Sequence, residues 1–485
     1  MNLDLLAPEL SLAVTAVVLI LLDLFVEKKG ILVAVSIIGL AVSAGFSIAL
    51  WDTSDTAFND VLAVDNFALF FKLVFVGVAA LVILASVDYA SRFSRFQGEY
   101  HALVVISALG MSLMAASAEL ITVYVSLELA SVSLYVLAGF LKDPKSTESS
   151  IKYMLLGATS SAVLLYGMAL VFGSTGTTQL AEIMRVVQGL GGAGAADNPA
   201  LVLGVVLLIA GFGFKIAAVP FQMWVPDVYE GAPTPIVAYL SVASKAAGFA
   251  IILRMFQTAF GAPYWLSLNW GLVFAVLAVI GMTVGNLSAL PQTNIKRMFG
   301  YSSIAQAGYL LVGLAAIGVA SPASALGQST VLFFLVSYAA ANMGAFIAII
   351  AITSKMDSDL IQDFSGMIKR SPVLALALTL CLISLIGMPP AAGFMAKFYI
   401  FSAAVNSGLL WLVVIAVVNS VISAAYYLRV VKVMWLGEPP ATEQVPSSGA
   451  LRVALSLTCL GVLFIGILPG FAMKAAEFAV RVFGS

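Results

Sequence analysis

Four ionisable residues lie deep inside apolar stretches of this 485-residue chain. They are the lysines Lys215, Lys245 and Lys397 and the glutamate Glu128. A charge at the centre of a membrane-spanning helix costs about 2.5–3.5 kcal/mol on insertion scales, and such residues commonly mark ion or proton pathways. Each of these side chains can take up and release a proton. We therefore predict that the four residues move protons across a membrane.

Glu128 is the only acidic residue that the sequence places so deeply, which makes it the natural partner of a buried lysine. A Glu–Lys pair that opens and closes would act as a two-state switch for proton transfer, with water bridging the gaps between sites. The alternative is a static structural ion pair. For Lys72 and Lys152, nearer the ends of their apolar segments, the simplest expectation is a side chain that snorkels to the membrane surface.

Helix breakers accompany two of the lysines. Gly211–Lys215 and Gly393–Lys397 share the pattern Gly-Phe-x-x-Lys, and prolines follow the first (Pro220) and precede the second (Pro389 and Pro390). Proline removes a backbone donor and kinks or interrupts a helix, which exposes polar backbone in the membrane. Paired broken helices in inverted repeats mark ion sites in transporters. An ordinary kink is the alternative for each proline.

The composition identifies a polytopic membrane protein. Hydrophobic residues make up 62% and charged residues only 10% of the chain, against about 25% charged in soluble domains. Apolar runs long enough to cross a bilayer recur along the whole length and predict an all-α fold with about fourteen transmembrane helices. The expected spans are 5–26, 31–51, 67–87, 102–118, 120–140, 151–172, 200–219, 234–257, 270–290, 299–319, 327–352, 374–402, 405–432 and 451–472. The first is too long for a signal-peptide core, so we expect it to be retained.

Neither a cofactor nor a metal is expected in this chain. Cys381 and Cys459 each lie in an apolar segment with no second thiol nearby, which excludes an iron–sulfur site and argues against a disulfide. The single histidine, His101, is expected in an inner loop beside Tyr100 as an interfacial residue. No nucleotide-binding fingerprint is present, and the net charge of −1 leaves no basic surface for nucleic acid.

The basic residues predict the orientation. Four of them, Arg185, Arg254, Lys474 and Arg481, fall on the side of the N-terminus, together with an acidic loop. Fourteen fall on the other side, which the positive-inside rule makes the inner one, so both termini are predicted to face outward. The fourteen are Lys28, Lys29, Arg92, Arg95, Lys142, Lys145, Lys296, Arg297, Lys355, Lys369, Arg370, Arg429, Lys432 and Arg452.

The chain is predicted to form a single membrane domain, 1–485, with internal repetition. We expect three N-terminal helices and a loop in 1–101, a first inverted repeat in 102–257, a second in 270–432, and a C-terminal helix and tail in 451–485. The repeats would comprise helices 4–8 and 9–13. Within the longest loop, Gln179–Gln188 predicts a short surface helix, and the glycines after it predict a flexible link.

The segment from Gly211 to Gly248 resembles the antiporter-like membrane subunits of respiratory complex I. It reads GFGFKIAAVPFQMWVPDVYEGAPTPIVAYLSVASKAAG. The stretch Tyr301–Tyr309 is similar to the element that opens helix ten in this family. Within the family, Tyr229–Pro235 and the lysine at position 397 are most similar to subunit N.

The resemblance implies roles for the buried residues. Glu128 would be the helix-five glutamate, Lys215 its partner, Lys245 the central relay and Lys397 the outlet, while Lys152 resembles a further helix-six lysine. Gln222 and Gln306 stand where family members often have histidine, which puts any mechanism that needs a titratable group there in doubt. Glutamine can still hydrogen-bond to ordered water.

The same resemblance implies a proton-translocating subunit of an NADH-quinone oxidoreductase in the cell inner membrane. NADH, FMN, iron–sulfur clusters and quinone would bind to partner subunits, and the neighbours would be L-type and M-type antiporter-like subunits and small membrane subunits. Three alternatives remain open: a subunit of a multisubunit cation/proton antiporter, a subunit of a related ferredoxin-driven complex, and a purely structural spacer.

Overall fold

The computed structural model describes residues 3–26, 29–89, 96–190, 198–261, 270–319, 325–356, 358–439 and 448–483. Lys28, Arg92 and Arg95, which contribute to the predicted orientation, and the glycine link 191–197 lie outside the described residues.

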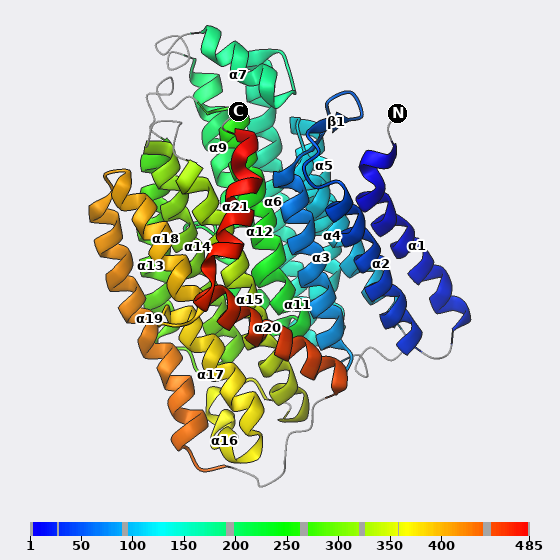
Figure 1. Cartoon of the computed structure of the whole chain (residues 1–485), viewed down its shortest axis with the longest axis vertical. Helices are drawn as coiled ribbons and strands as arrows, with labels where there is room; N and C mark the ends of the chain where they lie inside the picture. Colours follow the sequence, from blue (N-terminus) through cyan, green and yellow to red (C-terminus); the bar gives the residue numbers. More distant parts are fainter. Residues whose placement is uncertain are drawn as a thin grey trace.

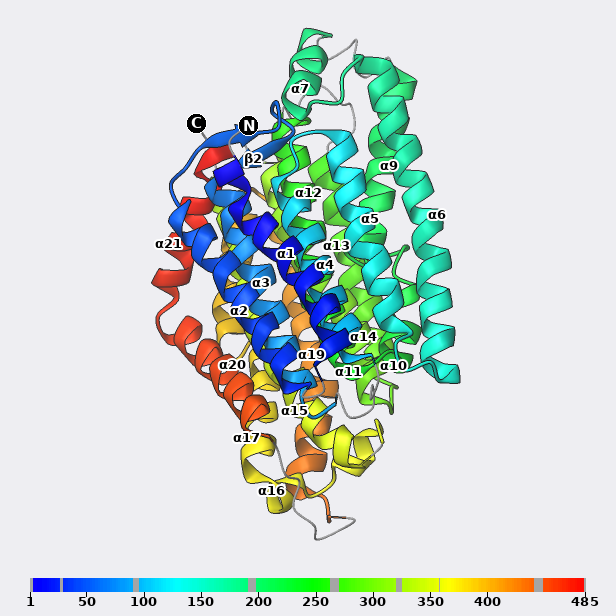
Figure 2. The same cartoon turned by 90° about the vertical axis from the view of Figure 1, so that its right-hand side faces the viewer.

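The protein is a bundle of helices that run mostly along the long axis of the molecule (Figures 1 and 2). Within the described ranges, twelve helices are long and apolar enough to cross a membrane, against about fourteen predicted, and two further apolar helices, Pro199–Lys215 and Pro372–Ile386, are shorter. The expected all-α polytopic fold is confirmed, and the chain is a multi-pass membrane protein. Both chain ends lie toward the same end of the bundle (Figures 1 and 2).

The helices and strands follow one another along the chain from the N-terminal end. The first are η1 (Leu3–Leu6), α1 (Ala7–Phe25), α2 (Gly30–Ala49), β1 (Asp55–Ala57), β2 (Leu62–Val64), α3 (Asn66–Ser86), α4 (Gln97–Ala116), α5 (Leu120–Ala138), α6 (Pro144–Thr175), α7 (Leu180–Gly189), α9 (Pro199–Lys215), α10 (Trp224–Gly231) and α11 (Thr234–Tyr239). The chain continues with the π-helical η3 (Leu240–Ser244), α12 (Lys245–Thr258), α13 (Trp270–Ala289), α14 (Ile295–Val319), α15 (Ala325–Met356), η4 (Ile361–Phe364), α16 (Met367–Arg370), α17 (Pro372–Ile386), α18 (Ala392–Asn406), α19 (Leu410–Leu436), α20 (Gly449–Ile467), α21 (Pro469–Ala479) and η5 (Val480–Phe483).

Several helix boundaries differ from those expected. The predicted single span 374–402 is two helices, α17 and α18, because Gly387 takes a left-handed conformation (φ +92°) and the following Pro389 and Pro390 offer no backbone donors. Helix α6 begins seven residues before the predicted start, where the Asp143 carboxylate accepts a hydrogen bond from the Ser146 N–H at 2.9 Å. The predicted C-terminal tail contains α21, and the predicted surface helix is confirmed as α7.

Two polar residues are more deeply buried than the sequence suggested. Lys72 does not snorkel: it is 1% exposed, and its Nζ lies 2.6 Å from Oε1 of Glu9, which is also buried. The opposite charge on a neighbouring helix stabilises the ammonium inside the bundle, so Glu128 is not the only deep carboxylate. His101 is likewise not in a loop, because α4 begins before it at Gln97 and packs against α1, which buries the imidazole.

The two cysteines are free but not isolated. Cys381 of α17 and Cys459 of α20 bring their thiols together, because the two helices pack against each other. The expectation that neither thiol has another nearby is therefore wrong: sequence distance concealed a contact between helices.

A buried ion pair holds the start of α3 against α12. Both guanidinium nitrogens of Arg254 donate to the Asp65 carboxylate, at 2.9 and 2.8 Å, and its Nε donates to the Ala115 carbonyl at 2.7 Å. Arg254, one of the four basic residues predicted on the outer side, is 4% exposed. Burial alone would raise the pKa of Asp65, but the Arg254 charge and the Ala68 N–H outweigh it and hold the pKa below the usual 3.8.

We expect Asp65→Asn to destabilise the protein, because it leaves the Arg254 guanidinium buried without a counter-charge. Removing one partner of a buried pair costs about 3–5 kcal/mol. Thermal unfolding of the purified protein should show the loss. Glu182→Gln is the matched control, because it breaks the exposed pair with Arg185 and should change stability by less than about 1 kcal/mol. Equal melting temperatures for wild type and Asp65→Asn would contradict this role of the pair.

The same pair predicts a dependence on pH. Because the pKa of Asp65 is lowered on folding, its stabilising contribution is present above about pH 3.8 and is lost as the pH falls toward the lowered value. The difference in melting temperature between wild type and Asp65→Asn should therefore be full at neutral pH and shrink under acid conditions. If the melting-temperature difference grew on acidification, the Asp65 pKa would not be lowered by folding, which would contradict this account of the pair.

Candidate functional site

Glu128 projects from α5 toward α6. The Ser161 hydroxyl of α6 donates a hydrogen bond to its carboxylate, and the side chain is half-buried. The carboxylate therefore has a polar partner within the bundle without being sealed from its surroundings.

Lys215 is the last residue of α9 and is 4% exposed. Its Nζ donates to Oγ of Ser131 at 2.8 Å, and Ser131 lies one helical turn after Glu128 on α5. Among the described residues Lys215 forms no direct ion pair, although the Glu128 charge acts on it through space. The structure thus brings the predicted Glu128–Lys215 partners close together, with the carboxylate and the ammonium held by different serines.

Lys245 follows directly after the π-helical turn η3, within the continuous helix Thr234–Thr258. Short π-helical turns often occur at functional sites. The Lys245 ammonium donates to both oxygens of Ser303 in α14, its Oγ at 2.5 Å and its carbonyl. Ser303 also meets the hydroxyls of Tyr229, at 3.1 Å, and Tyr338, at 3.4 Å. The central lysine therefore lies in a closed polar cluster within an apolar core.

Lys397 lies in α18 beside the broken end of α17. Its Nζ donates to the carbonyls of Leu385 and Ile386, at 3.2 and 2.8 Å, and to Oγ of Ser420 at 2.8 Å. The ammonium also sits 4.5 Å from the centre of the Tyr309 ring. These carbonyls are free to accept because the helix ends there. The break in the helix thus supplies the ligands of a buried cation.

Gly387 is required at this break for a second reason. A Cβ at this position would lie 2.8 Å from Cδ of Lys397, so any side chain would displace the lysine stem. The left-handed φ and the close lysine both select glycine.

Helix α14 connects the second and third lysines. Ser303 binds Lys245, and one turn later the Gln306 amide donates to the Leu385 carbonyl at 3.2 Å, the same oxygen that accepts from Lys397. The first two lysines are also neighbours in the fold: a Cβ on Gly248, one turn after Lys245, would lie 3.4 Å from Cγ of Lys215. The stem of Lys215 therefore packs against the helix of Lys245, whereas polar groups connect Lys245 with Lys397.

The two glutamines have different surroundings. Gln306 takes part in the connection between Lys245 and Lys397. The side-chain oxygen of Gln222 is buried and has no hydrogen-bond partner among the described residues. Gln222 lies in the segment between the end of α9 and the start of α10. Trp224 joins the two helices across this segment, because its indole N–H donates to the Phe214 carbonyl at 3.1 Å.

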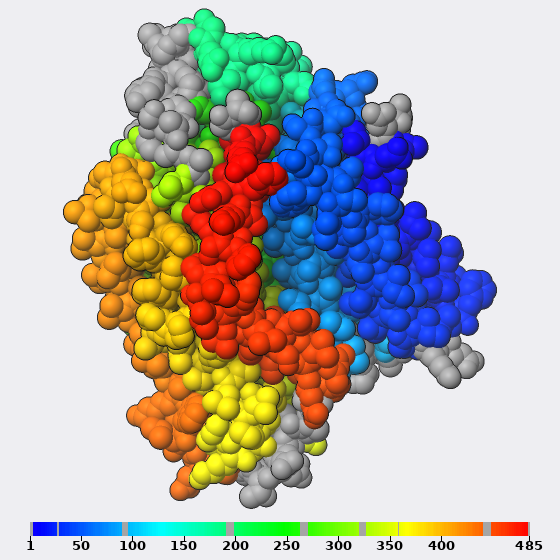
Figure 3. Space-filling view, viewed as in Figure 1, coloured from blue at the N-terminus to red at the C-terminus, as the bar shows by residue number. Residues whose placement is uncertain are grey.

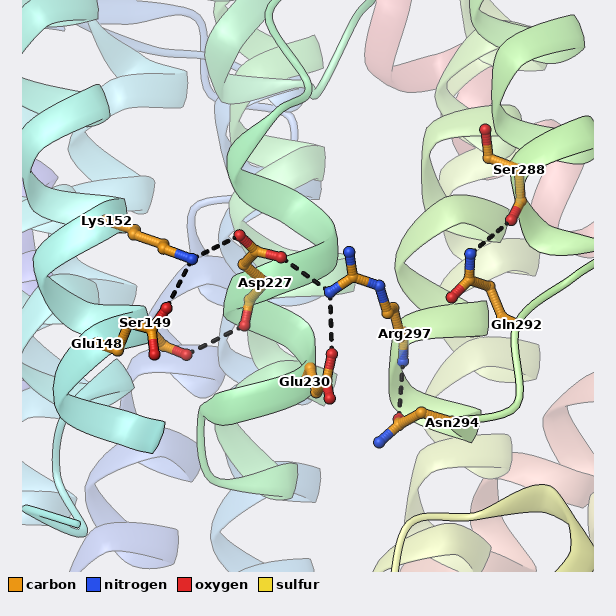
Figure 4. A network of polar contacts seen from close by, with 9 residues as sticks. All are labelled: Glu148, Ser149, Lys152, Asp227, Glu230, Ser288, Gln292, Asn294 and Arg297. Carbon is orange, nitrogen blue, oxygen red and sulfur yellow. Dashed lines mark hydrogen bonds and ion pairs between the residues drawn. The ribbon is translucent and has the colours of Figure 1, made fainter. Parts of the chain in front are cut away.

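Lys152 is not part of this buried line but belongs to a charged network at the start of α6 (Figure 4). Its Nζ lies 2.7 Å from Glu148 and 2.8 Å from Asp227, and Asp227 also accepts from Arg297 at 2.8 Å. Arg297 in turn reaches Glu230 at 2.9 Å. The network lines an open cavity of about 240 Å³.

Asp227 is the centre of this network and joins α6 to α14 through α10. Burial would raise the pKa of Asp227, but the cations Lys152 and Arg297 lower it overall. The side chain therefore stays ionised at neutral pH and holds both cations. Sequence reasoning included Asp227 in a motif but gave it no role.

Ser303, Tyr229 and Tyr338 were also not predicted. Serine and tyrosine are common in helices, so the sequence gives no reason to select these three. Only the folded structure shows that they gather around the Lys245 ammonium. The signal that was available is the motif Tyr301–Tyr309, which contains Ser303 and Gln306. No group of residues that could hold a metal ion occurs in the described part of the chain.

The chain is similar to known membrane proteins over nearly its whole length. Residues 117–423 match the family described as NADH:quinone oxidoreductase/Mrp antiporter, TM. The "NADH-quinone oxidoreductase subunit N" of Dehalococcoides mccartyi is 50% identical over 482 residues, covering 99% of each chain.

Solved structures show the same fold. A chain of respiratory complex I from Thermus thermophilus with bound aureothin superposes with a TM-score of 0.81 at 32% identity and covers 96% of this chain and 98% of its own. A chain of the Mrp complex from Dietzia sp. gives a TM-score of 0.86 at 20% identity, covering 99% and 97%, and this shows the fold alone. The chain belongs to the NADH:quinone oxidoreductase/Mrp antiporter membrane family and, within it, to the group of NADH-quinone oxidoreductase subunit N.

Proposed function

We propose that this chain translocates protons as the N-type membrane subunit of an NADH-quinone oxidoreductase in the cell inner membrane. The observation that carries the proposal is the line of three buried lysines, each bound to serine or backbone oxygens, of which Lys245 and Lys397 are connected through α14. Partner subunits would hold NADH, FMN, iron–sulfur clusters and quinone, and L-type and M-type subunits would lie alongside. This subunit of the translocase would carry protons but no electrons.

A proton would move by changing which lysine is charged. Glu128 and Lys215 form the driven pair: a change in the charge near Glu128 alters how strongly Lys215 holds its proton. Release from Lys215 passes a proton to Lys245, and Lys397 discharges it outward. Water would complete the gaps between the side chains, and Lys152 would act as a secondary residue at the inner end.

The helices at the two ends of the lysine line are interrupted: α9 ends at Lys215, and α17 ends at Ile386, beside Lys397. We infer that they belong to two inverted units, 102–257 and 270–432, with both termini outward. The shared Gly-Phe-x-x-Lys pattern and the breaks after Lys215 and before Lys397 support this symmetry. The inner face would carry most of the basic loop residues.

The alternative function is a cation/proton antiporter subunit, favoured by the likeness in fold to the Mrp complex. The two differ in what drives transport. Isolation of the intact complex decides between them: iron–sulfur signals and NADH-quinone activity support the oxidoreductase, whereas sodium-dependent pH changes in vesicles without an electron donor support the antiporter. A related ferredoxin-driven complex would show the iron–sulfur signals with a different donor.

Lys215→Ala and Lys245→Ala should each abolish proton transfer through this subunit. Positioned proton-transfer groups contribute about 10²–10⁴-fold to rate, so the loss lowers the protons translocated per NADH oxidised. The measurement is quinone-coupled acidification of inverted vesicles. Lys432→Ala, which removes a basic residue of α19 outside the lysine line, is the control. Full pumping by both variants would show that these lysines do not carry the proton. Altered assembly with an unchanged proton-to-electron ratio would indicate that the subunit is a structural spacer.

Ser303→Ala should slow translocation while leaving assembly intact. It removes the hydroxyl shared by Lys245, Tyr229 and Tyr338 but keeps the backbone carbonyl that also binds Lys245. We expect a decrease of roughly tenfold in this subunit's proton transfer, less than for Lys245→Ala. Ser402→Ala is the matched control, since that serine bonds within its own helix. Pumping rates equal to the control would remove Ser303 from the pathway.

A further inference from the structure

A groove away from the lysine line has a charged end and apolar walls. It lies between α16 and α17 on one side and α20 on the other, with a volume of about 1170 Å³. Figure 3 shows these segments, yellow and orange-red, next to each other on the lower part of the surface. Neither the family's proton chemistry nor the charged network of Figure 4 involves this groove.

Three cations line one end of the groove: Lys369, Arg370 and Arg452. Arg452 and Lys369 are exposed, whereas Arg370 is 7% exposed and donates to the Met356 sulfur at 3.4 Å. Helices α17 and α20 both begin here, so their positive dipole ends add to the three charges. This end of the groove is therefore suited to an anion.

Below the cations the walls are apolar. Val373, Leu376 and Leu380 follow one another at three- and four-residue spacing along α17, and Leu455 and Cys459 face them from α20. Val373 is 68% exposed and Leu376 is 52% exposed, so the wall is open along its length. An occupant must therefore combine an anionic head with an apolar body.

We propose that the groove binds one anionic phospholipid, with its phosphate at Lys369, Arg370 and Arg452 and an acyl chain along α17 and α20. Basic pockets between membrane helices on the inner side recognise anionic headgroups. The positive-inside rule accounts for basic residues on this face, but not for three of them sharing one cavity with an apolar wall. An apolar helix of a neighbouring subunit would match the wall but would bring no anion to the basic end. The inference does not depend on proton translocation.

Cys459 reports on occupancy, because it lines the groove whereas Cys381 is buried. The purified intact complex is delipidated and supplied with either phosphatidylglycerol or phosphatidylcholine, and alkylation of the Cys459 peptide by N-ethylmaleimide is followed by mass spectrometry. Only the lipid-free fraction reacts, so phosphatidylglycerol at about ten times its dissociation constant should slow alkylation roughly tenfold. Phosphatidylcholine should not.

Variants of the groove distinguish binding of the lipid headgroup from binding of the acyl chain. Lys369→Gln with Arg452→Gln should abolish the protection, while Lys432→Gln, which removes a basic residue of α19 outside the groove, should retain it. Ser456→Trp, which fills the groove without changing its charge, should reduce the phosphatidylglycerol retained after purification. Equal protection by both lipids would refute the anionic site, and a Cys459 already protected in the delipidated complex would show that a neighbouring protein covers the groove.

Discussion

A buried ammonium group must replace the water it has lost, and the centre of this protein is built around that requirement. Desolvating a cation costs several kcal/mol unless hydrogen-bond acceptors surround it. Lys215 has a serine, Lys245 both oxygens of Ser303, and Lys397 two carbonyls and Ser420. None of the three has a carboxylate in direct contact among the described residues. Neutral acceptors stabilise the charged form less than a carboxylate would, which fits the proposed role of these lysines in passing on a proton.

The breaks in the helices follow from the same requirement. A carbonyl inside an intact helix already accepts a hydrogen bond within the helix, so Lys245 must share the Ser303 carbonyl of α14, whereas the carbonyls of a last helical turn have no such partner. Ending α17 at Ile386 frees the carbonyls that bind Lys397, and the π-helical turn before Lys245 is a second departure from regular α-helix. Where a carboxylate does stay in contact with a buried cation, as in Asp65–Arg254 and Glu9–Lys72, the pair lies away from the lysine line. We infer that contact ion pairs fix the structure and that solvating oxygens serve transport.

Much of this architecture could be predicted from hydropathy and charge. The apolar runs located the helices, and the rarity of charges inside them singled out Lys215, Lys245 and Lys397. What could not be predicted depended on contacts between distant helices. Lys72 was expected at the surface because nothing in its own segment shows that Glu9 faces it.

The other differences between prediction and structure have local causes or involve residue types that are common in helices. The span 374–402 divides because a glycine and two prolines act together, and each alone is compatible with a kink. The sequence did not show that Ser303 and Asp227 each bind several partners, because serine and aspartate have many roles in proteins. Only the folded structure shows which side chains meet at each of them. The Cys381–Cys459 contact was missed for the same reason.

We propose that hydrogen bonds and ordered water connect the three lysines into one line. A structure of the intact complex at a resolution that shows ordered water would test this continuity. We expect water bridging Lys215 to the Lys245–Ser303 cluster, and water or direct hydrogen bonds from that cluster through Gln306 to Lys397. Dry apolar packing between any two of these sites in every state of the working complex would contradict it.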